Sequence, residues 1–302
     1  MNRWLVYARE RFPLAQNGVL IAAFSASAIA FSALVRGSGH VPAWHLVAAG
    51  FASSFLMFAL LRIADEFKDA ADDARWRPYR PVPRGLVTLR GLAVAGAICM
   101  GLQLAIALAV NARLVPGLLL VWAWFGLMSA EFFARGWLRA HPIAYIASHM
   151  AIVPLIDWYV SSFDWLVADV PAPHALGWFL AVTFLNGLVV EVGRKMRAPQ
   201  DEEPGVETYT AMWGRGGATA VWFGAIACNV ALATIAAAYV GFARVDAVVF
   251  GALAFAAAAC GIAFLRANRA GSGRGIEAMT GAWTVGSYLF LGIVPLGVHV
   301  LS

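Results

Sequence analysis

The chain has 302 residues, of which 61% are hydrophobic and only 13% are charged, and its mean hydropathy is +0.73. This composition excludes an ordinary soluble domain and predicts that most of the chain lies in lipid. The net charge of +5 is explained by arginines in loops that orient membrane helices, so we expect no nucleic-acid binding.

The predicted elements begin with a short amphipathic helix at the membrane interface, within residues 1–18, that is not a cleavable signal peptide. Nine apolar runs follow, and each approaches the length of about 20 residues that a helix needs to cross a bilayer. They cover approximately residues 17–35, 43–62, 91–111, 115–132, 141–162, 174–192, 217–242, 245–265 and 278–301. The sequence therefore predicts an all-α, polytopic membrane protein in which residues 1–302 form one domain of nine transmembrane helices.

The distribution of basic residues predicts the orientation of these spans. With nine spans, the N-terminus and the loops after spans two, four, six and eight share one side. Of the 22 lysines and arginines, only Arg36, Arg113 and Arg244 lie on the other side. Because lysine and arginine concentrate in cytoplasmic loops, we expect a cytoplasmic N-terminus and an external C-terminus, in a bacterial inner membrane.

Acidic residues gather in two loops on the predicted cytoplasmic side, at about residues 62–90 and 191–216. These clusters comprise Asp65, Glu66, Asp69, Asp72 and Asp73, then Glu191, Asp201, Glu202, Glu203 and Glu207. Both loops end in a Gly-x-x-Thr step, which starts at Gly85 in the first and at Gly205 in the second. A weak two-fold internal repeat is consistent with this spacing, and we expect the two loops to cap one central cavity.

The charges in these loops predict a site for a divalent cation and a diphosphate. Asp65, Asp69 and Asp73 are spaced i, i+4 and i+8, so a helix that continues from span two places them on one face. Carboxylates in this number suit Mg²⁺, which bridges acids to substrate phosphates. The basic residues that we expect to bind phosphate oxygens are Lys68, Arg80, Arg194 and Lys195. The alternative is a solvated helix whose acids and bases pair with each other.

The stretch from Arg62 to Thr88, RIADEFKDAADDARWRPYRPVPRGLVT, resembles the first signature of the UbiA superfamily of membrane prenyltransferases. That signature is an Asn-Asp-x-x-Asp-x-x-x-Asp run followed by Arg-Pro-x-Pro-x-Gly. The matching positions are Asp65, Glu66, Asp69, Asp73, Arg80, Pro81, Pro83 and Gly85. Nine spans with acidic loops after the second and sixth helices also resemble this family.

The chain departs from the family pattern in both loops. Asp65 and Glu66 replace the leading Asn-Asp, and the acids of the second motif, normally Asp-x-x-Asp-Asp, are displaced. Because Pro199 ends a helix, we expect Asp201 and Glu202 on a loop and Glu191 at a helix end.

The resemblance implies Mg²⁺-assisted ionisation of an isoprenyl diphosphate and transfer of the prenyl group to a lipophilic, often aromatic, acceptor. It implies catalytic roles for Asp65, Asp69, Asp73, Glu191 and Asp201, with Glu66 and Glu202 as further metal ligands. Two alternatives keep the fold, a terpene cyclase and a phosphoribosyl-type transferase. A cation permease is a third, but the acids crowd one surface rather than the bilayer midplane.

Four further polar residues lie in or near the spans, where ionisable groups are costly. Glu131 is expected either to pair with Arg135 or to serve the active site. For Asp157 we expect solvation at the outer interface, and for His149 a hydrogen bond inside the bundle, with substrate contact as the alternative. Asn186, about a turn before Glu191, is expected to bind substrate or to hydrogen-bond to another helix.

Overall fold

The computed structural model describes residues 2–267 and 269–301, which contain helices and no strand. The α-helices are α1 (Arg3–Arg11), α2 (Leu14–Val35), α3 (Trp44–Lys68), α4 (Ala70–Trp76), α5 (Leu89–Val110), α6 (Val115–Ser129), α7 (Arg135–Ala140), α8 (Pro142–Met150), α9 (Ile152–Trp165), α10 (Leu176–Gly193), α11 (Tyr209–Ala238), α12 (Ala243–Arg266), α13 (Gly273–Tyr288) and α14 (Val294–Leu301). The short segments are η1 (Ala112–Leu114), η2 (Glu131–Phe133), η3 (Pro199–Asp201) and the π-helical η4 (Leu289–Ile293).

Nine helical stretches in the described part of the chain are long and apolar enough to cross a membrane. The predicted all-α membrane fold is therefore confirmed, and the chain is an integral membrane protein. Helices α2 and α10 are the most buried of the spans, whereas α5 and α6 are among the least buried. Large apolar side chains on the outer helices, such as Val248 and Phe255 of α12, are exposed as lipid-facing residues are.

Three spans depart from regular helices for identifiable reasons. The fifth is divided into α8 and α9, because Pro154 lacks the N–H that would bond to the carbonyl of Met150. Pro295 follows the π-helical segment η4 in the ninth span and likewise lacks a donor. The seventh begins at Tyr209 rather than at 217, and Gly214, with φ of +69°, kinks its first turns.

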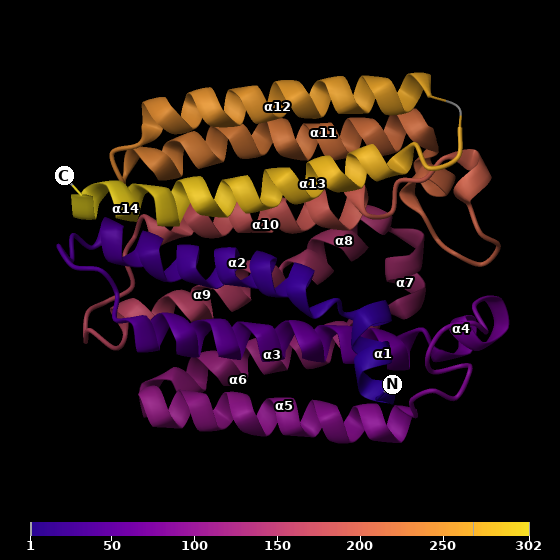
Figure 1. Ribbon diagram of the computed structural model, residues 1–302, viewed down its shortest axis with the longest axis horizontal. Helices are drawn as coiled ribbons and strands as arrows, with labels where there is room; N and C mark the ends of the chain where they lie inside the picture. The colour runs from indigo at the N-terminus through magenta and orange to yellow at the C-terminus, as the bar shows by residue number, and fades with distance from the viewer. Residues whose placement is uncertain (1, 268, 302) are drawn as a thin grey trace.

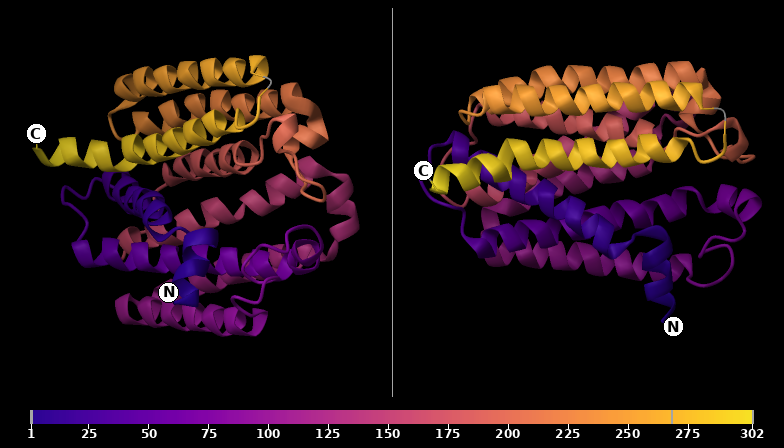
Figure 2. Two further views of the ribbon diagram at one scale, coloured as in Figure 1. Left: turned by 45° about the vertical axis from the view of Figure 1, so that its right-hand side comes forward. Right: turned by 45° about the horizontal axis from the view of Figure 1, so that its top comes forward.

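The loops that carry the acidic clusters lie at the same end of the bundle as α1 (Figure 1). The C-terminus and the connection from α2 to α3 lie at the opposite end, and the rotated views agree (Figure 2). This arrangement brings the segments 69–88 and 194–208 to one surface, although more than 100 residues separate them in the sequence.

Candidate functional site

The backbone of the first loop nearly continues α3. The helix ends at Lys68 and α4 begins at Ala70, with Asp69 between them. The N–H of Asp69 still bonds to the carbonyl of Asp65 at 2.9 Å, and the N–H of Asp73 bonds to that of Asp69 at 2.8 Å. Asp65, Asp69 and Asp73 therefore keep the helical spacing despite the break at Asp69.

Two acids of this loop are buried and neutralised by arginines. Asp73 accepts ion pairs from Arg77 and Arg80, both at 2.8 Å. Glu66 is paired with Arg11 of α1 at 2.5 Å and with Arg62 at 3.6 Å. Arg80, predicted to bind phosphate, is thus held by Asp73. The acids and bases pair with each other, as the alternative of a salt-bridged helix expects, but the two acids are buried rather than solvated.

Asp65 and Asp69 are less engaged. The side chain of Asp65 is 48% exposed, and its ion-pair partner, Arg62, is 3.5 Å away. Asp69 forms no ion pair within the described residues. Burial, together with the neighbouring carboxylates of Asp65 and Asp73, raises the pKa of Asp69. A cation at these two carboxylates would relieve their repulsion.

The end of α10 has the opposite arrangement, because its acid is surrounded by donors. Glu191 is buried and contacts Arg194 at 2.5 Å and Lys195 at 2.7 Å. The hydroxyl of Tyr209 donates to the same carboxylate at 3.0 Å. The side chain of Arg194 is 48% exposed, so it combines a fixed position with access for a ligand.

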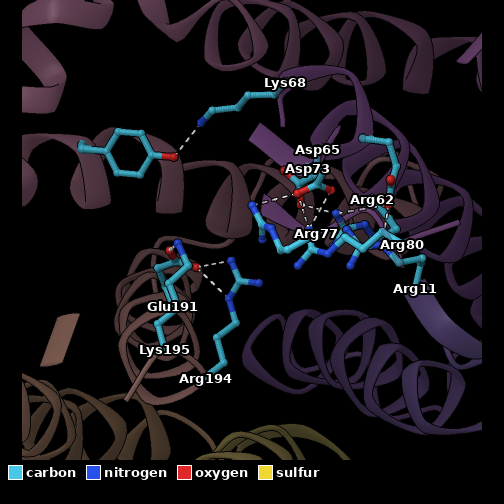
Figure 3. Close-up of polar contacts among 12 residues, drawn as sticks. Arg11, Arg62, Asp65, Lys68, Asp73, Arg77, Arg80, Glu191, Arg194 and Lys195 are labelled. Carbon is cyan, nitrogen blue, oxygen red and sulfur yellow. Dashed lines mark hydrogen bonds and ion pairs between the residues drawn. The ribbon is translucent and has the colours of Figure 1, made fainter. Parts of the chain in front are cut away.

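The two loops meet directly. The hydroxyl of Tyr79 donates to Glu203 at 3.1 Å, and the indole of Trp76 packs where a Cβ on Gly205 would project. Glu191 above all raises the pKa of Arg194, and Asp65 of the first loop raises it further. Figure 3 shows Glu191, Arg194 and Lys195 on one side and the acids and arginines of the first loop on the other.

The remaining acids predicted in the second loop organise its backbone. Asp201 and Glu202 follow Pro199 outside any α-helix, as expected. Asp201 accepts the N–H of Gly271, in the α12–α13 connection, at 2.7 Å. Glu202 accepts the hydroxyls of Thr208 and Thr210 at 2.7–2.8 Å.

The predicted set of seven metal ligands is not gathered into one cluster. Within residues 2–267 and 269–301, no group of three or more His, Cys, Asp or Glu side chains is arranged to hold a metal ion. Among the predicted ligands of the first loop, Asp65 and Asp69, one helical turn apart, have the fewest close cationic partners. Such a pair fits Mg²⁺, which is usually held by one or two carboxylates together with substrate phosphates and water.

Lys68 extends to a cluster that the sequence did not reveal (Figure 3). Its ammonium donates to the hydroxyl of Tyr145 at 2.6 Å and pairs with Glu131 at 3.0 Å. Arg135 is 4.0 Å from Glu131, so Lys68 is the closer partner. The sequence signal for a polar cluster here is that Tyr145 lies four residues before His149, which places both side chains on one helical face.

The polar residues in the spans have mixed outcomes. Asp157 is fully buried, so the expected solvation at the outer interface is wrong; helix packing, not distance along the span, sets its exposure. The side-chain amide oxygen of Asn186 accepts from Asn229 at 2.8 Å and from Trp283 at 3.1 Å, which are the expected hydrogen bonds between helices. Nδ1 of His149 bonds to the backbone carbonyl of Tyr145 at 2.9 Å within the same helix, and its Nε2 has no partner among the described residues, so the ring is only partly satisfied.

A polar hollow of about 410 Å³ opens beside the second loop. Its lining combines Arg194, Arg197 and Arg274 with acids that include Asp201 and Glu277. These residues come from the second loop and the start of α13, so this hollow lies on the Arg194 side of the site.

Comparison with known proteins supports the fold through structure. The sequence matches no model of a protein family and no curated protein. A solved structure of a digeranylgeranylglyceryl phosphate synthase, a membrane prenyltransferase of the UbiA superfamily, superposes with a TM-score of 0.57. The match covers 100% of both chains at 12% sequence identity. The chain therefore has the all-helical fold of UbiA-type membrane prenyltransferases.

Proposed function

We propose that this chain is a membrane prenyltransferase that moves a prenyl group from an isoprenyl diphosphate to a lipophilic acceptor. The observation that carries the proposal is the pairing of unlike loops at one end of the bundle. The first loop carries Asp65 and Asp69, and Asp65 is close enough to raise the pKa of Arg194 on the second loop, which is held by Glu191 and remains accessible. A diphosphate with a bound cation is complementary to both halves.

Asp65 and Asp69 would hold Mg²⁺ together with the diphosphate, while Arg194 and Lys195 contact its oxygens. The metal supplies Lewis-acid stabilisation of the negative charge that develops on the leaving diphosphate. Arg194 does the same from the second loop, because its guanidinium is oriented by Glu191 before the substrate arrives. Lys195 is shared with Glu191 and adds positive charge on the same side.

The other predicted ligands have supporting parts in this proposal. Asp73 and Glu66 anchor the arginines that shape the first loop, and Asp201 and Glu202 fix the second loop. The end of the bundle that carries both loops is cytoplasmic in this proposal, in a bacterial inner membrane. The apolar interior of the bilayer supplies the prenyl chain and receives the lipophilic product.

A transfer assay tests the proposal with radiolabelled geranylgeranyl diphosphate, Mg²⁺ and a panel of phenolic and alcoholic lipid acceptors. We expect a prenylated product from the wild-type protein. Asp69→Asn should lower the rate about 10²–10³-fold, which is the effect of removing one preorganised electrostatic group.

Asp72→Asn is the matched control, because Asp72 is an exposed acid of α4, three residues after Asp69. Its rate should remain within about two-fold of the wild type. Equal rates in Asp69→Asn and wild type contradict the metal assignment. Release of a cyclic hydrocarbon, or transfer of phosphoribose in a parallel assay with phosphoribosyl diphosphate as the donor, contradicts the proposed reaction.

A further inference from the structure

The polar hollow beside the second loop is separate from the acids of the first loop. Its described lining comes from residues 193–203 and 271–277, which belong to the second loop and to the start of α13. Arg194 is the residue that this lining shares with the proposed donor site. The volume of about 410 Å³ equals that of roughly a dozen water molecules at about 30 Å³ each. The hollow therefore has room for a small hydrated ion of its own.

Two arginines in this hollow lack a counter-charge. Arg197 and Arg274 line it, and neither forms an ion pair within 4.0 Å in the described part of the chain. Arg194, by contrast, is held by Glu191 at 2.5 Å. A guanidinium group stays charged and offers five N–H donors. Arg197 and Arg274 therefore have donors available for an anion.

Arg274 lies where a cation is unfavourable. It belongs to the first turn of the 16-residue helix α13, and the N-terminal end of a helix is positive. Its guanidinium folds back over the preceding turn, since a Cβ on Gly271 would lie 3.7 Å from its Nε. The first turn of α13 has no acidic residue and no side-chain cap, and Oγ of Ser272 is inaccessible to solvent without a partner in the described chain. A bound anion would offset the positive charge of both the helix end and the guanidinium.

The acids of the hollow indicate what kind of anion fits. Asp201, Glu202 and Glu203 already accept hydrogen bonds from the protein. Glu277 is exposed and lies three residues after Arg274. Mg²⁺ keeps several of its waters and is bound through one or two carboxylates together with phosphates. A lining of arginines and an exposed carboxylate therefore suits a diphosphate that carries a divalent cation.

We propose that the hollow is a second binding site, which takes the inorganic diphosphate released by the transfer as its Mg²⁺ complex. The inference rests on the proposed function. Arg197 and Arg274 bind the phosphate oxygens, and Glu277 contacts the waters of the metal. Arg194 belongs to both sites, so the diphosphate keeps one cationic partner as it moves between them. Its departure frees Asp65 and Asp69 for the next donor.

The test is a calorimetric titration of inorganic diphosphate with Mg²⁺. The protein is first saturated with geranylgeranyl thiolodiphosphate, a donor analogue that does not react readily, so that the donor site is occupied. We expect saturable binding of inorganic diphosphate to this saturated wild type. Arg274→Gln should weaken that binding about 10–100-fold, which is the effect of losing one charged hydrogen bond. The affinity for the donor analogue should not change.

Arg269→Gln is the matched control, because Arg269 is an exposed arginine of the same connection and lies outside the described lining. It should bind inorganic diphosphate as the wild type does. Arg197→Gln is a second variant of the hollow and should weaken binding as Arg274→Gln does. Failure of inorganic diphosphate to bind the saturated wild type overturns the inference. Wild-type affinity in both variants of the hollow also overturns it.

Inhibition kinetics give an independent readout. Because the hollow can fill while the donor is bound, inorganic diphosphate should lower kcat of the wild type as well as raise KM for the donor. In Arg274→Gln the effect on kcat should disappear at the same concentrations, and the effect on KM should remain. Inhibition of the wild type through KM alone would place inorganic diphosphate in the donor site only and overturn the inference.

Failure of the proposed function is recognised separately. Absence of donor-analogue binding to the wild type contradicts the proposed function, and this inference with it. Binding of the analogue without any further site for inorganic diphosphate overturns this inference alone.

Discussion

The two acidic loops share a backbone conformation, a glycine with positive φ followed by a threonine N-cap, but their charged side chains are arranged differently. Gly85 and Gly205 have φ values of +76° and +73°, which glycine adopts at little cost. Three residues later Thr88 accepts the N–H of Gly91, and Thr208 accepts that of Ala211, both at 3.1 Å. Each threonine is thus the N-cap of the next membrane helix, which supports the predicted two-fold repeat at the level of local geometry.

The charges do not follow this repeat. The first loop leaves Asp65 and Asp69 with distant or no cationic partners, whereas the second surrounds Glu191 with Arg194, Lys195 and Tyr209. A duplicated framework can therefore carry a cation-binding half and an anion-binding half. In this account, the positive charge of the second loop comes from its own side chains, whereas that of the first loop comes from a bound metal ion.

The largest expected effect that would sharpen this contrast is on Arg194. Arg194→Gln removes a charged donor to the diphosphate, and such hydrogen bonds contribute about 1.5–3 kcal/mol. We expect KM for geranylgeranyl diphosphate to rise about 10–100-fold, measured by initial rates. Arg139→Gln, which changes an exposed arginine 3.7 Å from Glu207, is the control and should leave KM unchanged.

The variant Glu191→Gln distinguishes two roles for Glu191, as the ion-pair partner of Arg194 and Lys195 or as a metal ligand. We expect a loss of about 1–3 kcal/mol of stability, because removal of the buried carboxylate leaves Arg194 and Lys195 without a counter-charge. The Mg²⁺ concentration for half-maximal activity should not change. A large increase in that concentration would make Glu191 a metal ligand and remove the distinction between the loops.

Alanine substitutions at Gly85 and Gly205 test the shared backbone conformation, with smaller expected effects. Gly85 has open space around it, whereas a Cβ at Gly205 would collide with the indole of Trp76. We expect Gly85→Ala to cost about 1–2 kcal/mol from the left-handed backbone alone, and Gly205→Ala to cost more. Thermal denaturation in detergent measures both, and equal losses would show that the contact between the loops is weak.

The smallest effect concerns pH in the metal-free protein. Burial, with Asp65 and Asp73, raises the folded-state pKa of Asp69 above its unfolded value. Protonation of Asp69 therefore favours the folded state: this stability is fully present below the unfolded pKa of about 3.9. It is lost as the pH rises through the folded pKa. The Tm of wild type relative to Asp69→Asn should increase as the pH falls through this range, and a constant difference would contradict it.

The sequence predicted the features that depend on chain-local physics. Hydropathy gave the nine spans, and the positions of Pro154 and Pro295 hold the signals for the broken fifth and ninth spans. The sequence predicted neither the ion-pair partners of the acids nor the burial of Asp157, because both depend on tertiary packing. Arg11 reaches Glu66 from another helix, and Arg80 reaches Asp73 through the fold of residues 77–85.

Binding of a prenyl diphosphate to the shared site is the central claim, and calorimetric titration of geranylgeranyl thiolodiphosphate, with and without Mg²⁺, tests it most directly. We predict saturable binding of the analogue to the wild type that requires Mg²⁺, and loss of the Mg²⁺ requirement or of binding in Asp69→Asn. Binding that is indifferent to Mg²⁺ and to Asp69, or the absence of binding, would contradict the account.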